Sequence, residues 1–156
     1  MDDSEVRRVI YDMTMRGGTP PLARDVAQVL GTAEEEVFAS FQRLADAHMI
    51  VLQRDSREIL MAMPYSAVPT AFAVRANGIH SFANCMWDAL GIAAMLHSDA
   101  HIHTSCADCG SAVDVRVENG AVIGGSQQNP RGVNHATNIN ITLEAVRSVD
   151  QVWRTT

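Results

Sequence analysis

The stretch SFANCMWDALGIAAMLH, residues 81–97, decides the fold of this chain. Its side chains are apolar nearly all round, apart from a thiol at Cys85 and a carboxyl group at Asp88. A helix that is apolar on all sides is buried in a protein core. We therefore predict a buried central helix over residues 81–97, capped by Ser81, with mixed strands packed around it.

Short strands are predicted on both sides of this helix. Residues 71–74 are rich in apolar and aromatic side chains, and the dipeptide Asn77-Gly78 after them is a turn signal. Residues 111–117 alternate between polar and apolar, which is typical of a strand. Further elements are expected as a return strand over 121–123, a last strand over 138–143 and a short helix or turn over 146–153.

The N-terminal part of the chain has a different pattern, with three helices before a hairpin. The predicted helices cover residues 4–16, 22–30 and 33–47, the last with a capping box of Thr32 and Glu35, and the predicted strands cover residues 48–52 and 58–63. This order is that of a winged-helix unit. Pro64 to Pro69 read as a connector, so we predict an α+β protein with a winged-helix-like domain at 1–66 and an α+β domain at 67–156.

A winged-helix unit often binds DNA, but the charges of this chain argue against that role. The third helix starts with Glu34, Glu35 and Glu36, and the whole chain has a formal net charge of -6. Carboxylates suit a helix N-terminus, yet they would repel phosphates in a groove. A structural cap is therefore the expected role of this unit.

Composition sets the broad class of the protein. Hydrophobic residues make up 47% and charged residues 19%, which is typical of a folded globular chain. The acidic start lacks the basic and apolar regions of a signal peptide, so we expect a cytoplasmic protein that does not enter membranes. The three cysteines form an odd count, which in a reducing compartment indicates thiol chemistry or soft-metal binding rather than a disulfide framework.

Cys85 and Asp88 are the first candidate site. They lie three residues apart, and residues at that spacing share one face of a helix. A thiol can hold a soft cation while a neighbouring carboxyl group handles a proton. We expect both side chains to face one partly enclosed pocket, where burial would raise the pKa of Asp88.

The second candidate site follows the helix. Cys106-Ala107-Asp108-Cys109-Gly110 has the spacing of a metal knuckle, in which a turn brings two sulfurs to one ion. His101 and His103 could complete a tetrahedral zinc site, or a partner chain could. Alternatively the pair and Cys85 could form a three-thiolate site for a soft ion, or the two thiols could simply lie in a turn between strands.

The run Phe82-Ala83-Asn84-Cys85-Met86-Trp87-Asp88-Ala89-Leu90 resembles the active-site helix of organomercurial (alkylmercury) lyases, where an aspartate follows a cysteine by three residues. As in that family, a strand and a further cysteine follow, here Cys106, whose role in the family is mainly structural. The similarity covers residues 20–116, with a weaker echo through Trp153.

This resemblance implies that carbon–mercury bonds are cleaved by protonolysis, giving a hydrocarbon and Hg²⁺. Cys85 would be the first mercury ligand and Asp88 the proton donor, with low-molecular-weight thiols as partners, no required cofactor and a role in mercury resistance. The family's second catalytic cysteine would fall near Asn138-Ile139-Asn140, but no cysteine follows Cys109. The expectation is therefore tight organomercurial binding with slow or absent turnover, unless Cys109 replaces the missing ligand.

Two other functions remain as alternatives. One is a non-enzymatic protein that binds zinc or another thiophilic ion through Cys106 and Cys109. The other is a winged-helix regulator that responds to metal.

Overall fold

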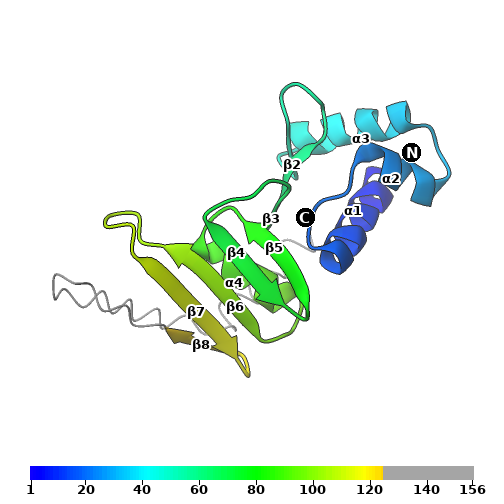
Figure 1. Cartoon of the computed structure of the whole chain (residues 1–156). Coiled ribbons are helices and arrows are strands. Elements are labelled where there is room, and N and C mark those ends of the chain that lie inside the picture. The colour runs from blue at the N-terminus through cyan, green and yellow to red at the C-terminus, as the bar shows by residue number, and fades with distance from the viewer. Residues whose placement is uncertain (125–156) are drawn as a thin grey trace. The chain divides into compact units, whose positions relative to one another are not determined.

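The computed structural model describes residues 1–124 (Figure 1). Their contacts group the chain into two compact units, Met1–Pro69 and Thr70–Thr156. The predicted strand over 138–143, the predicted helix over 146–153 and the position near Asn138 lie outside the described residues. The predicted α+β fold is confirmed, because three helices come first and antiparallel strands with one further helix follow.

The first unit begins with α1 (Asp3–Gly17), α2 (Ala23–Leu30) and α3 (Glu34–Asp46). The Asp2 side chain accepts a hydrogen bond from the Ser4 N–H and caps α1. Gly18 ends this helix with a φ of 81°, a left-handed conformation that suits glycine. The predicted capping box at Thr32 is wrong. Ala33 is the N-cap of α3 without a side-chain bond, and the Thr32 hydroxyl instead donates to the Glu36 carboxylate.

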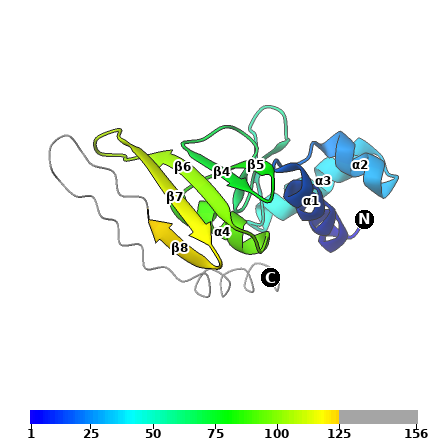
Figure 2. The ribbon, with the colours of Figure 1, turned by 60° about the horizontal axis from the view of Figure 1, so that its bottom comes forward.

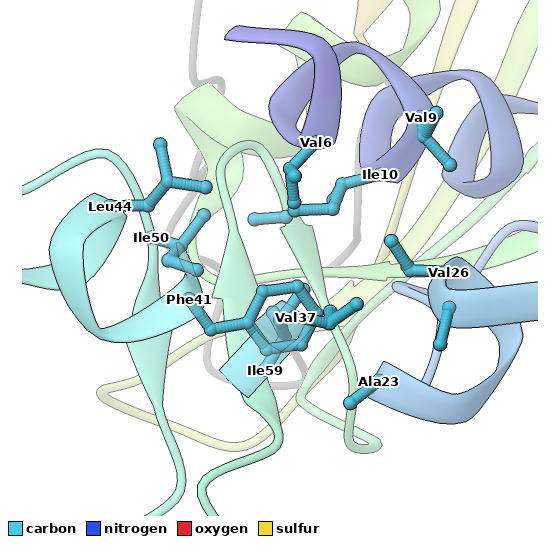
Figure 3. Close-up of a cluster of buried hydrophobic side chains, with 12 residues drawn as sticks. Val6, Val9, Ile10, Ala23, Val26, Val37, Phe41, Leu44, Ile50 and Ile59 are labelled. Carbon is cyan, nitrogen blue, oxygen red and sulfur yellow. The ribbon is translucent and has the colours of Figure 1, made fainter. Parts of the chain in front are cut away.

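The three helices share a core of aliphatic side chains around one aromatic ring (Figure 3). Phe41 is fully buried, and Val37 precedes it by one helical turn on the same face of α3. Val6 and Ile10 come from α1, and Ile59 comes from the strand that follows the helices; all three are buried in the same cluster. This amphipathic packing, rather than helix propensity, holds the short helices together.

Three short strands complete the first unit. They are β1 (Val51–Leu52), β2 (Ile59–Ala62) and β3 (Tyr65–Ser66), joined by antiparallel pairing of β1 with β2 and of β2 with β3. The strand predicted from residue 48 starts later, at Val51, because His48 has a φ of 60° and belongs to the turn after α3. The Tyr11 hydroxyl donates to the Met63 carbonyl oxygen across 2.8 Å and ties α1 to the end of β2.

The second unit is an antiparallel sheet with one helix. Its elements are β4 (Phe72–Ala76), β5 (Ile79–Ala83), α4 (Met86–Met95), β6 (Ala100–Ser105), β7 (Ala112–Glu118) and β8 (Ala121–Gly124). The strands lie in the order β5-β4-β6-β7-β8, so β6 pairs with β4 rather than with β5, which precedes it in the chain. Figure 2 shows these strands side by side.

Alternation of side chains gives the sheet one buried and one exposed face. In β6, Ile102 and Thr104 are buried, whereas His101 and His103 are exposed. Helix α4 contacts β4 and β5, and its buried residues are Ala89, Leu90, Ile92, Ala93 and Ala94. The helix therefore covers one face of the sheet instead of being enclosed by strands.

The predicted bounds of this helix were too wide at the N-terminal side. Residues 81–83 belong to β5, and Ser81 pairs with Val74 instead of capping a helix. The turn at Asn77-Gly78 is confirmed, with a φ of 51° and 76° at its two residues. Such a turn needs a strand on each side, and pairing with β4 overrides the helical pattern of residues 79–83. Among the described residues, no helix is long and apolar enough to cross a membrane.

Candidate functional site

Cys85 lies at the point where the chain passes from β5 into α4. It is the N-cap residue of α4, with extended backbone at φ −154° and ψ 178°. Its sulfur accepts a hydrogen bond from the Asp88 N–H across 3.4 Å, and the thiol is exposed. Helix capping, rather than a shared helical face, therefore brings Cys85 and Asp88 together. The exposed thiol also differs from the partly enclosed pocket that we predicted for it.

Asp88 lies in the first turn of α4 and is half-buried. Burial raises its pKa above the ordinary value, because a desolvated carboxylate is less stable. Hydrogen bonds from Asn84 and from the Cys85 thiol partly offset this effect. The predicted rise of the Asp88 pKa and its predicted cause, burial, are confirmed.

Two residues next to this pair have a contact or an exposure that we did not predict from the sequence. Asn84, which we did not single out, contacts the Asp88 carboxyl group from the residue before the cap. Its place four residues before Asp88, one helical turn away with Cys85 between them, is the signal that could have identified it. Trp87 belongs to the helix that we predicted to be buried, yet it is 41% exposed. Its ring therefore lies on the surface next to Cys85 and Asp88 in the chain.

Cys106 and Cys109 lie in the turn between β6 and β7. The Gly110 N–H donates to the Cys106 carbonyl oxygen at 2.9 Å, and the Cys106 N–H donates to the Ser111 carbonyl oxygen at 2.8 Å. Gly110 has a φ of 69°, which this tight turn requires. Hydrogen bonds with Ser111 and with the Cys106 thiol lower the pKa of Cys109. The turn thus holds two thiols next to each other, with Cys109 exposed.

His101 and His103 point to the exposed face of β6, where they share a partner on β7. His101 Nε2 lies 3.1 Å from Asp114 Oδ1, and His103 Nδ1 lies 2.9 Å from the same oxygen. These contacts, His103 first, lower the pKa of Asp114. Within residues 1–124, no three His, Cys, Asp or Glu groups meet in a way that could hold a metal ion. The histidines are thus paired with a carboxylate that the sequence did not single out.

The same exposed face carries a shallow hollow of about 360 Å³ at the other end of β6. Arg75, His101 and Arg116 line it, and the pairing register places them in one row across β4, β6 and β7. Asp99 and Glu118 also line the hollow. Glu118 pairs with Arg116 at 3.4 Å, and the Asp99 carboxylate accepts a hydrogen bond from the Asn119 N–H at 2.8 Å. The positive and negative charges that line the hollow are therefore largely balanced.

Comparison with known proteins gives two findings. A protein-family model described as "MerB: Alkylmercury lyase" matches residues 65–148, more than half of the chain. A solved structure, described as "Crystal structure of the mercury-bound form of MerB2", is similar with a TM-score of 0.63 and 24% identity. The match covers 92% of this chain and 66% of that one, and at this identity it shows a shared fold.

No curated protein matches this sequence as a relative. The family match includes the helix with Cys85 and Asp88 and the turn with Cys106 and Cys109. On the basis of this match, the chain belongs to the alkylmercury lyase family.

Proposed function

We propose that this protein binds organomercurials through Cys85 and that Asp88 donates a proton to the carbon that leaves mercury. The observation that carries this proposal is the contact between the Cys85 sulfur and the first turn of α4, which holds a thiol beside a half-buried carboxyl group. A thiolate is the preferred ligand of a soft cation. A carboxyl group whose pKa is raised by burial keeps its proton more readily, as a general acid requires.

The reaction needs electron density on mercury while the proton reaches carbon. Cys85 supplies one thiolate, and the chain has no cysteine after Cys109 to supply the family's second one. The remaining thiols, Cys106 and Cys109, lie in a separate turn. We therefore propose tight binding of the organomercurial with slow cleavage. The structure described as mercury-bound MerB2 supports mercury as the ligand class, because this chain shares its fold.

Binding alone is a weak test, since any exposed thiol takes up an organomercurial cation. The experiment therefore uses a Cys106→Ser/Cys109→Ser background, in which Cys85 is the remaining thiol, and phenylmercuric acetate as the probe. Mercury retained against excess low-molecular-weight thiol measures whether the site is more than a surface cysteine. Benzene released in a single turnover measures cleavage.

In this background we expect mercury retention and slow benzene release, both lost in the additional variant Cys85→Ser. Asp88→Asn should keep the retention and lower benzene release by roughly 100-fold or more, as for loss of a general acid. Asp108→Asn is the matched control, because it removes an exposed carboxylate that lies outside α4. Equal mercury retention by Cys85 and by a free thiol, or unchanged benzene release in Asp88→Asn, would contradict the proposal.

The runner-up function is a non-enzymatic metal-binding protein. The adjacent thiols of Cys106 and Cys109 in an exposed turn favour it. It predicts metal uptake without benzene release in any variant. A winged-helix regulator receives less support, since α3 begins with three exposed carboxylates that would repel DNA.

A further inference from the structure

The two segments that carry the three thiols of the chain leave the sheet at the same end. Ala83 pairs with Phe72, which lies beside Thr104 when the register between β4 and β6 is continued by one residue. Cys85 lies two residues beyond Ala83, and Cys106 lies two residues beyond Thr104. In Figure 1 the passage from β5 into α4 and the turn between β6 and β7 accordingly lie at one end of the sheet.

The strand order sets the distance across the sheet between the ends of β5 and β6. One strand, β4, lies between β5 and β6, so the two exits are roughly 10 Å apart across the sheet. The Thr70 hydroxyl donates to the Ala83 carbonyl oxygen at 2.5 Å and fixes the exit of β5 against the start of β4. The exit of β6 is fixed by the hydrogen bond from the Cys106 N–H to Ser111. Cys85 and the pair therefore lie at one end of the sheet as separate sites, and no three-ligand metal group forms among the described residues.

We propose that the Cys106–Cys109 pair is the acceptor for Hg²⁺ that Cys85 holds after cleavage, so that the ion passes between thiols at this end of the sheet. This inference rests on the proposed function for its source of Hg²⁺. Mercury on Cys85 has one protein thiolate and one exchangeable ligand, such as a solution thiolate. The pair offers two thiolates from one turn, and a second linked ligand improves retention by a factor of roughly 100 or more.

The transfer is a ligand exchange without oxidation or reduction. A low-molecular-weight thiol takes the place of Cys85 on Hg²⁺: its sulfur bonds to the ion, the bond to Cys85 breaks, and its proton passes to the Cys85 sulfur. The two thiols of the pair then displace the two low-molecular-weight thiolates from Hg²⁺ one after the other, and the protons of the pair pass to the thiolates that leave. The ion ends between Cys106 and Cys109, and Cys85 is again a free thiol that can bind the next organomercurial.

Inorganic Hg²⁺ tests the transfer without any cleavage. One equivalent is added to the full chain in the presence of a low-molecular-weight thiol, remaining protein thiols are alkylated at successive times, and mass spectrometry locates the labels. At equilibrium we expect Cys85 to be labelled and Cys106 and Cys109 to be protected. In Cys106→Ser and in Cys109→Ser, protection should move to Cys85 and mercury retention should fall roughly 100-fold. Asp108→Asn, which changes the turn but keeps both sulfurs, should behave as wild type.

The order of events separates a relay from direct capture. Protection of Cys85 that appears first and then moves to the pair, at a rate that rises with the concentration of the low-molecular-weight thiol, supports the relay. Protection of the pair at equal speed in Cys85→Ser would overturn it, as would Cys85 remaining protected in wild type. Failure of benzene release with this labelling pattern intact would contradict the cleavage proposal alone. Circular dichroism of each serine variant checks that the fold is unchanged.

Discussion

The Asp88 N–H donates a hydrogen bond to the Cys85 sulfur across 3.4 Å, so the proposed mercury ligand is also the cap of α4. An N-cap satisfies a backbone N–H that has no partner within the helix. The same contact places the sulfur beside the first turn of α4, which also carries the Asp88 carboxyl group. Any change at Cys85 therefore alters helix stability and metal chemistry together, and the two effects must be separated.

Serine and alanine at position 85 make this separation. The Cys85→Ser hydroxyl can still accept the Asp88 N–H, whereas Cys85→Ala removes the acceptor. We expect Cys85→Ala to be less stable than Cys85→Ser by roughly 0.5–1 kcal/mol, the usual loss for an exposed cap. Chemical denaturation measures this difference, and both variants should lose mercury retention. Equal stability of the two variants would show that the sulfur does not act as a cap.

The raised pKa of Asp88 gives a pH dependence with a definite sign. The pKa of Asp88 in the folded protein lies above the unfolded value of about 3.9. The fold is therefore weakened as pH rises from the unfolded pKa through the folded pKa, because the carboxyl group ionises in this range. The neutral variant Asp88→Asn avoids this cost. The unfolding free energy of Asp88→Asn minus that of wild type should therefore increase from pH 3 to pH 7. A constant difference across this range would mean that burial does not affect the carboxyl group.

The sequence predicted the site pair better than the element that presents it. Cys85 and Asp88 were identified by their spacing and resemblance, but the helix was predicted to start at Ser81 and begins at Met86. Apolar residues such as Phe82 and Ala83 fit a helix or a strand equally well over so short a run. The pairing of Ala83 with Phe72 decided the outcome, and such long-range pairing is not visible in a local pattern.

The partners of the histidines illustrate the same limit. His101 and His103 alternate along β6, which the sequence shows, but their contact with Asp114 depends on the register between β6 and β7. That register pairs His103 with Asp114 directly. Thiol spacing in Cys106 and Cys109, in contrast, is a local property of one turn, so the sequence sufficed to place these two sulfurs together.

Asp114 provides a pH prediction of the opposite sign. The contacts with His103 and His101 lower its pKa below the unfolded value, so its stabilising effect is present above about pH 3.9 and is lost as pH falls through the folded pKa. Asp114→Asn should be less stable than wild type at pH 6, by a small amount because the carboxylate is partly exposed. Thermal unfolding at pH 6 and pH 2.5 should show this difference shrinking at the lower pH.

The core of the first unit should be sensitive to loss of its one fully buried phenylalanine. Phe41 is completely buried among aliphatic side chains of the three helices, so Phe41→Ala should lower the unfolding free energy by about 3–5 kcal/mol. Val29→Ala is the matched control, since Val29 is 58% exposed on the neighbouring helix. Urea denaturation measures both. A loss below about 1 kcal/mol in Phe41→Ala would place the ring outside a packed core.

The variant Cys109→Ser distinguishes two roles for Cys109, as an acceptor of the product Hg²⁺ and as a second thiolate during cleavage. If the acceptor function is its main role, Cys109→Ser should leave the first benzene release from phenylmercuric acetate unchanged and slow the later ones, because Hg²⁺ then stays on Cys85. If Cys109 instead supplies the second thiolate during cleavage, the first release itself should fall. Rapid quenching under single-turnover conditions, followed by the multiple-turnover rate in the same variant, separates these outcomes. We expect the first, since Cys85 and Cys109 lie on turns separated by β4. Fast multiple turnover in Cys109→Ser would show that one thiolate is enough for the complete reaction and that the pair accepts no product.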